Sequence, residues 1–276
     1  MTKTDALLGR VRNFWNSRPC NIRHSKAPVG SRQFFEETAA RRYFVEQHIP
    51  VFADFPKWSG KKVLEIGCGI GTDAIQFGLA GAKMTMIELS DKSIDVARQG
   101  FTAFGLSGRF LNADAEELSK HLPPGDRFDL IYSFGVIHHS PHPERILKEL
   151  QKYCHPQTEL RIMLYAKWSW KVLWIIVKFG KGRFWRTKKL VAQYSEAQEG
   201  SPVTHIYSGR EARRLMKDYE IVSMEKTFIF PYRIKDYIEH RYVKEWYFRW
   251  MPDWVFRRLT KYFGWHLLIT ARPKPT

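Results

Sequence analysis

Three glycines alternate with other residues in the segment Val63–Ile75, directly after a short apolar run. The segment reads VLEIGCGIGTDAI, which places Gly67, Gly69 and Gly71 at every second position. A turn this rich in glycine lets a ligand approach the backbone where side chains would otherwise stand in the way. A dinucleotide fingerprint requires G-x-G-x-x-G, and Thr72 occupies the place of its last glycine. The spacing therefore disfavours a nicotinamide or flavin enzyme.

Three acidic residues near the turn indicate which ligand it binds. Glu65 stands two residues before the first glycine, where its carboxylate suits an ammonium group. Glu88 ends the next apolar run, seventeen residues after Gly71, and a carboxylate there can accept hydrogen bonds from both hydroxyls of a ribose. Asp114 follows a third apolar run and is placed to accept from an adenine amino group. A ligand with an amine, a carboxylate, a ribose and an adenine is S-adenosylmethionine, whose carboxylate would face the free amides of the helix that begins near Gly71.

Alternating strands and helices would bring these residues together, and the sequence has that pattern from Lys61 onward. We predict strands over residues 62–66, 82–89, 108–114, 127–134 and 158–166, and helices over residues 72–80, 91–101 and 115–122 and from Pro143. Strands and helices that alternate at this spacing form a parallel sheet covered on both faces.

The segments on either side of this core have a different character. We expect Ser31 to cap the helix Phe34–His48, and strands over 219–230 and 265–273 to flank a long aromatic, basic helical stretch from Arg233 to Tyr262. We therefore divide the chain into an N-terminal helical cap (1–57), a cofactor-binding core (58–166), an insertion or lid (167–218) and a part that completes the sheet (219–276).

Four ordered motifs together resemble the class I S-adenosylmethionine-dependent methyltransferases, and are most similar to the ubiquinone/menaquinone-biosynthesis type. The motifs are VLEIGCGIGTDA, IELS, NADAEEL and FDLIYSFGVIHHSPHPERILKEL, and the resemblance covers residues 60–166 and, more weakly, the final strand pair. It implies an α/β, Rossmann-like fold: a seven-stranded, mostly parallel sheet whose last strand is antiparallel, with helices on both faces. It also implies that S-adenosyl-L-homocysteine is the product. The cofactor-binding residues that it implies are Glu65, Gly67, Cys68, Gly69, Gly71, Glu88, Leu89, Asp114, Ala115, Ser133 and Phe134.

Two adjacent histidines follow the fourth predicted strand, at the edge of the expected cofactor pocket. Methyl transfer to oxygen or carbon often requires a proton to be removed, and histidine suits that task at neutral pH. We expect His139 or His138 to act as the base or to orient the acceptor. The alternative is that one histidine packs structurally and the other hydrogen-bonds the loop.

The residues that bind the acceptor do not follow from the family resemblance. We expect an acceptor pocket built from Tyr165, Trp168 and Tyr207 and closed by the N-terminal segment around Phe14, Trp15, Arg32 and Phe35. No Asp/Asn-Pro-Pro-aromatic stretch follows the fourth strand, which argues against methylation of exocyclic amines of nucleic-acid bases. No Pro-Cys follows it either, which argues against a cysteine nucleophile that attacks a cytosine carbon. No spacing of metal-ligand residues stands out, so we predict no metal.

Charge and tryptophan are concentrated outside the core. The net charge is +17 overall, −2 over residues 61–150 and +14 over residues 151–276, and eight of the ten tryptophans follow residue 150. This distribution suits a phosphate-bearing partner or an anionic membrane surface, or else an ordinary surface whose lysines lie along apolar patches. The apolar run Trp168–Val177 is about half of the ~20 residues that cross a bilayer. It is therefore suited to a membrane interface, or to covering an apolar pocket.

The sequence thus favours a methyltransferase that acts on a small, hydrophobic or amphipathic acceptor, lipid-like or aromatic. The alternatives are an RNA- or tRNA-modifying methyltransferase that uses the basic C-terminal half, and a non-catalytic S-adenosylmethionine-binding module. Residues 1–12 lack the apolar core of a secretory signal, so we expect a cytoplasmic protein, with peripheral membrane contact as an option. The sequence does not specify the acceptor or the oligomeric state.

Overall fold

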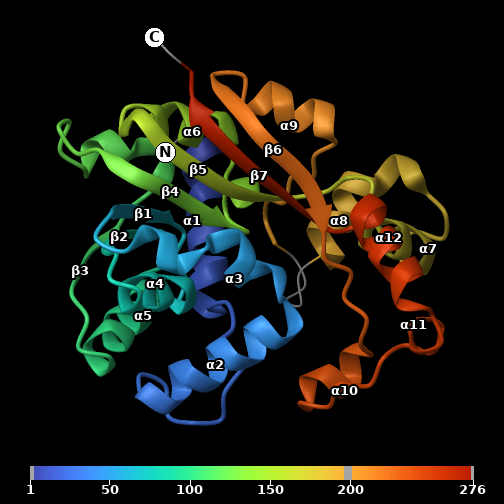
Figure 1. Ribbon diagram of the computed structural model, residues 1–276. Coiled ribbons are helices and arrows are strands. Elements are labelled where there is room, and N and C mark those ends of the chain that lie inside the picture. Colours follow the sequence, from blue (N-terminus) through green and yellow to red (C-terminus); the bar gives the residue numbers. More distant parts are fainter. Residues whose placement is uncertain (1–2, 196–200, 275–276) are drawn as a thin grey trace.

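A seven-stranded sheet forms the centre of the computed structural model, which describes residues 3–195 and 201–274 (Figure 1). The ends of the expected cap and of the sheet-completing part (1–2 and 275–276), and residues 196–200 of the expected insertion, lie outside the described residues. The strand order is β3-β2-β1-β4-β5-β7-β6, and β7 runs antiparallel to both of its neighbours. The predicted fold class is confirmed. The strands are β1 (Lys62–Ile66), β2 (Lys83–Glu88), β3 (Gly108–Asn112), β4 (Phe128–Phe134), β5 (Cys154–Tyr165), β6 (Tyr219–Thr227) and β7 (His266–Pro273).

Side chains that alternate along each strand divide the core into two layers. On β1, Val63 packs with α4 (Thr72–Leu79) and α5 (Asp91–Ala103), whereas Leu64 packs on the opposite face with α6 (Pro143–Gln151). Because successive strand residues point to opposite faces, an apolar run such as that of β1 is expected where both faces are covered.

Two short 3₁₀ helices complete the core near the ends of β3 and β4: η2 (Ala115–Lys120) and η3 (Ile137–His139). Of residues 115–122, predicted as a helix, residues 115–120 form the 3₁₀ helix η2, which is interrupted at Glu117 (φ −133°, ψ 37°).

The N-terminal segment is helical, as predicted, and consists of α1 (Lys3–Ser17), α2 (Arg32–Val45), α3 (His48–Ala53) and η1 (Phe55–Trp58). The Ser31 hydroxyl accepts a hydrogen bond from the Phe34 amide at 3.1 Å and caps α2. Arg12 ties α1 to the ends of β2 and β3, because it donates to the Leu89 carbonyl (3.1 Å) and to Asn112 Oδ1 (2.7 Å). These bonds place α1 beside the carboxyl ends of the parallel strands.

The predicted long helical stretch from Arg233 to Tyr262 is wrong, because the structure forms three short helices there. His240 adopts a left-handed conformation (φ +62°) after the first of them. Met251 precedes Pro252, and proline disfavours helical geometry in the residue before it. The helices are α10 (Ile234–Ile238), α11 (Trp246–Arg249) and α12 (Asp253–Phe263).

The segment after β5 is helical, and its first helices lie beside the end of β6, where β7 begins (Figure 1). Its described elements are α7 (Trp170–Lys178), η4 (Phe184–Arg186), α8 (Thr187–Tyr194) and α9 (Gly209–Leu215). Within residues 3–195 and 201–274, every helix is too short or too polar to cross a lipid bilayer.

The Ser31 cap provides a test of how α2 is anchored. We predict that Ser31→Ala lowers the free energy of unfolding by about 1 kcal/mol, whereas Ser31→Gly lowers it by only a few tenths of a kcal/mol. Both variants lose the capping hydroxyl, but glycine is tolerated at an N-cap position and alanine is disfavoured there. Urea unfolding followed by circular dichroism measures both values. Equal stability of wild type and Ser31→Ala would contradict the capping role.

Candidate functional site

The glycine-rich turn lies between β1 and α4, at the carboxyl edge of the parallel strands. Gly67, Gly69 and Gly71 have φ angles of +72°, +55° and +83°, a region that favours glycine. A Cβ atom on Gly67 would approach Val136 Cγ1 to 2.3 Å. A Cβ atom on Gly69 would meet no described atom within 4 Å, because this residue borders a cavity. The turn is therefore shaped to leave space for a ligand.

Most of the predicted cofactor-binding residues line this cavity. They come from the ends of β1, β2 and β4 and from the loop after β3: Glu65, Gly67, Cys68, Gly69, Glu88, Leu89, Asp114, Ala115 and Phe134. Gly71 and Ser133 lie outside the lining. Gly71 is the N-cap residue before α4 and packs against Ala97. The Ser133 hydroxyl donates to the Ile66 carbonyl at 3.2 Å within the sheet.

Glu65 places a buried carboxylate on the cavity wall. Its Oε2 atom has no hydrogen-bond partner among the residues that the structure describes. Burial raises the pKa of Glu65 well above its usual range, and the charge of Asp73 raises it further. An unpartnered buried carboxylate oxygen is costly, so this atom is suited to a ligand that brings a donor or a positive charge.

Glu88 joins the glycine turn to the end of β2. Its two carboxylate oxygens accept hydrogen bonds from the Gly69 amide (2.9 Å) and the Ser90 amide (2.8 Å). Burial raises the pKa of Glu88, while these backbone hydrogen bonds act in the opposite direction. A carboxylate offers about four acceptor positions, so Glu88 retains capacity for ligand hydroxyls.

Asp114 lies at the end of β3, farther along the same edge. Its Oδ1 atom accepts from the Glu116 amide at 2.9 Å and caps η2. Burial raises the pKa of Asp114. Glu65, Glu88 and Asp114 thus follow the strand order β1, β2, β3 along one side of the cavity.

Sequence reasoning missed a buried network at the opposite side of the turn. Asp73, on the first turn of α4, accepts from the hydroxyls of Tyr43 (2.7 Å) and Tyr132 (3.1 Å) and pairs with Arg42 at 3.1 Å. Burial by itself would lower the pKa of Arg42, but the negative charges of Asp73 and Glu46 have the larger combined effect and raise this pKa. Arg42 therefore stays cationic on the cavity wall. The sequence could have indicated an ion pair here, because Arg42 and Glu46 have i,i+4 spacing on a predicted helix.

Helix α1 covers the cavity on the side of His139. Leu8, Val11 and Trp15 line it, and their spacing along the sequence is that of one helical face. The Trp15 ring meets the His139 ring edge-on, with centroids 5.2 Å apart. The sequence analysis expected Trp15 near the acceptor but missed Leu8 and Val11, although their helical spacing was visible.

The two predicted catalytic histidines have different surroundings. His139 lines the cavity, and its Nδ1 atom lies 2.9 Å from the Val203 carbonyl oxygen. His138 is fully buried outside the lining, with its ring 3.8 Å from the Tyr165 ring, and burial lowers its pKa well below the usual value. The geometry therefore leaves His139 as the candidate that a ligand can reach.

Of the other residues expected around the acceptor, Tyr165 lines the cavity, whereas Phe14, Arg32, Phe35, Trp168 and Tyr207 do not. Trp168 is 66% exposed on the surface, and Tyr207 forms a backbone bridge with Ala166. Phe35 is buried in the core, and Arg32 is exposed and pairs with Glu36. The structure instead brings Met163 and His266 to the wall near Tyr165.

Comparison with known proteins supports the family resemblance. A family model described as a methyltransferase domain matches residues 37–222. A ubiquinone biosynthesis O-methyltransferase from Pseudomonas syringae pv. tomato is 29% identical over 98 residues, which are 36% of this chain and 41% of that protein. One from Chromobacterium violaceum is 29% identical over 113 residues, 41% of this chain and 45% of that protein. The match thus spans less than half of the length of these curated relatives.

Solved structures share the fold over nearly the whole chain. The magnesium protoporphyrin IX methyltransferase of Synechocystis PCC 6803, crystallised with S-adenosylhomocysteine, has a TM-score of 0.60 and 16% identity, covering 97% of this chain and 100% of that one. A [4+2]-cyclase has a TM-score of 0.53 and 16% identity, and the match covers 98% of this chain and 95% of the cyclase. The second likeness indicates that this fold also carries other chemistry, so fold alone does not define the reaction. Because the family model covers more than half of the sequence, this chain belongs to the methyltransferase domain family, as its motifs predict.

Proposed function

We propose that this protein transfers the methyl group of S-adenosylmethionine to a hydrophobic or amphipathic small molecule. The observation that carries the proposal is the buried Glu65 Oε2 atom, which has no hydrogen-bond partner among the described residues. Glu65 lines the cavity beside a glycine turn with open space. The family membership and the O-methyltransferase names of the curated relatives support the same reaction class.

The three acids at the strand ends match the groups of the proposed cofactor in order. Glu65 would bind the amino group, Glu88 the ribose hydroxyls and Asp114 the adenine amino group. Gly69 leaves the space that the methionine part requires. Bound S-adenosylmethionine supplies a methyl group already activated by its sulfonium, so the chief task of the protein is to position the acceptor.

The cavity wall indicates the chemical class of the acceptor. Large apolar and aromatic side chains line it beside His139: Leu8, Val11, Trp15, Phe134, Met163 and Tyr165. Such a wall favours an acceptor that buries apolar surface. His139, oriented by the Val203 carbonyl, is the proposed base that receives the proton of an acceptor hydroxyl.

The acceptor can be found with methyl-labelled S-adenosylmethionine. We expect a host extract incubated with the protein and the labelled donor to yield a labelled small molecule of apolar character, identified by mass spectrometry. Label in the RNA fraction instead would support the RNA-modifying alternative. Binding of the donor without any labelled product would support the non-catalytic alternative.

Gly69 tests the position of the cofactor. We predict that Gly69→Val abolishes binding of S-adenosylhomocysteine, because the new side chain would project into the cavity. Gly105→Val is the matched control, since Gly105 also has a positive φ (+66° against +55°) and open space but does not line the cavity. Isothermal titration calorimetry measures both, with circular dichroism to check folding. Wild-type affinity in Gly69→Val would contradict the placement.

His139 tests the proposed base. We predict that His139→Ala lowers the rate of labelled product formation without weakening S-adenosylhomocysteine binding, because the side chain acts on the acceptor. His155→Ala is the control, since His155 pairs with Asp129 outside the cavity. Unchanged turnover in His139→Ala would remove this role.

An exposed aromatic surface lies on α7, α11 and α12, and supports a membrane-associated acceptor. Trp170 of α7 packs against Phe248 of α11, which packs against Phe256 of α12, so the three helices form one continuous region. We call its exposed apolar side chains the aromatic face: Trp168, Leu173, Val177, Trp246, Trp250, Trp254 and Tyr262. Exposed cations accompany it: Lys178, Arg249, Arg257, Arg258 and Lys261.

We propose that the aromatic face rests on an anionic membrane surface. Tryptophan suits the boundary between headgroups and acyl chains, and each nearby Lys or Arg gains about 1 kcal/mol at an anionic surface. Apolar side chains this exposed are otherwise a liability for a protein in water.

Vesicle sedimentation tests this surface. We predict binding to phosphatidylglycerol-containing vesicles that weakens with salt, and much weaker binding to phosphatidylcholine alone. Trp250→Ser combined with Trp254→Ser should reduce binding, whereas Val51→Ser, at a residue as exposed as Trp250 (80% and 79%), should not. Equal binding of all variants would contradict the proposal.

A further inference from the structure

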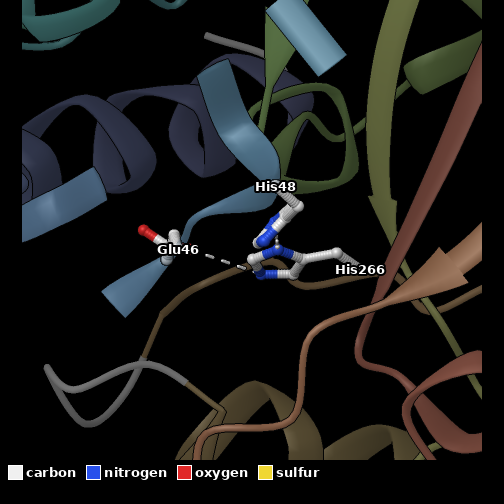
Figure 2. A group of neighbouring side chains, drawn as sticks. All are labelled: Glu46, His48 and His266. Carbon is white, nitrogen blue, oxygen red and sulfur yellow. Dashed lines mark hydrogen bonds and ion pairs between the residues drawn. The ribbon is translucent and has the colours of Figure 1, made fainter. Parts of the chain in front are cut away.

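Two histidines and a glutamate lie together in the structure (Figure 2). The His266 ring stacks 6.2 Å from the ring of Tyr165, and both residues line the cavity. Glu46 follows the last residue of α2, His48 begins α3, and His266 begins β7. His48 Nε2 lies 2.9 Å from His266 Nδ1, and His266 Nε2 lies 3.8 Å from Glu46 Oε1. One potential ligand atom from each residue lies within 4.8 Å of the other two. The sequence analysis predicted no metal because no spacing of metal-ligand residues stood out. The two histidines of this group are 218 residues apart in the sequence.

The chemistry of this set is that of a transition-metal site. Imidazole nitrogen and carboxylate oxygen are the ligands of catalytic zinc sites, which use three protein ligands and keep one position for water or substrate. Two nitrogens bound to one tetrahedral zinc ion at about 2.0–2.1 Å are about 3.3 Å apart. The two histidine nitrogens are now hydrogen-bond partners at 2.9 Å, so they would have to separate by about 0.4 Å and turn toward a shared ion.

The cavity wall holds more acidic than cationic side chains. Among the described lining residues, five are acidic and one is a lysine or arginine: Glu46, Glu65, Asp73, Glu88 and Asp114 against Arg42. Arg42 lies closer to Asp73 (3.1 Å) than to Glu46 (3.7 Å), so Asp73 is its nearer acidic partner. The other nearby cation, Lys171, lies over the Trp265 ring at 4.9 Å and outside the lining.

We propose that Glu46, His48 and His266 bind a divalent transition-metal ion, with zinc as the first candidate. Glu46 and His266 line the cavity, so the remaining coordination position would face the space proposed for the acceptor. A hydroxyl oxygen of the acceptor would bind there and be held for methylation. This last role rests on the proposed function, whereas metal binding itself does not.

Zinc and cobalt binding test the site directly. We expect metal-stripped, untagged protein to bind one Zn²⁺ per chain by calorimetry, and Co²⁺ to give the visible absorption of a tetrahedral site. Glu46→Gln and His48→Gln should each weaken zinc binding by on the order of 100-fold. Removing a metal ligand costs at least as much affinity as removing a residue that only hydrogen-bonds to a ligand. His155→Gln, whose histidine also lies beside an acid, should bind zinc like wild type.

A loss of folding must be separated from a loss of ligands. His266 is buried, so the decisive variants are Glu46→Gln and His48→Gln, at partly exposed residues, with thermal melts by circular dichroism as the check. Failure of the wild type to bind Zn²⁺ or Co²⁺ would overturn the proposal. Wild-type zinc affinity in both folded variants would also overturn it.

Titration of the metal-free protein with S-adenosylhomocysteine separates this inference from the proposed function. If S-adenosylhomocysteine binds and zinc does not, the metal site is refuted and the methyltransferase assignment stands. If zinc binds and S-adenosylhomocysteine does not, the metal site stands and the proposed function fails.

Discussion

The hydrogen bond from the Gly69 amide to the Glu88 carboxylate determines the shape of the cavity. It joins the turn after β1 to the end of β2, and the Ser90 amide holds the other oxygen of the same carboxylate. Glu88 is thereby held in place at the edge of the sheet, and Gly69 keeps its backbone turned toward open space. The proposed cofactor site depends on this bond, because Glu65 stands on β1 and Asp114 follows β3, the two strands on either side of β2.

Several buried charges share this small space and have different partners. Asp73 is neutralised by Arg42 and two tyrosine hydroxyls, so it is fully satisfied within the protein. Glu65 lacks such a partner among the described residues and carries a raised pKa. A buried acid that the protein leaves unsatisfied is a characteristic of a ligand site rather than of a structural network. This contrast supports Glu65, and not Asp73, as the residue that meets the ligand.

The sequence predicted what local patterns encode. The glycine turn, the strand β1 and the Ser31 cap follow from residues within a few positions of one another, and all appear where expected. The covering of the cavity could not be predicted in the same way, because residues distant in sequence build it. His48 and His266 come together only when β7 inserts beside β5. Trp168 was expected at the acceptor, but the chain turns outward after β5 and leaves it exposed.

The central claim is that S-adenosylmethionine binds in the cavity above the glycine turn, and a crystal structure of the complex with S-adenosylhomocysteine tests it most directly. The account predicts density in this cavity, with the amino group at Glu65, the ribose hydroxyls at Glu88 and the adenine beside Asp114. An empty cavity in crystals soaked with a saturating concentration, or a ligand lying with its adenine at Glu65, would contradict it.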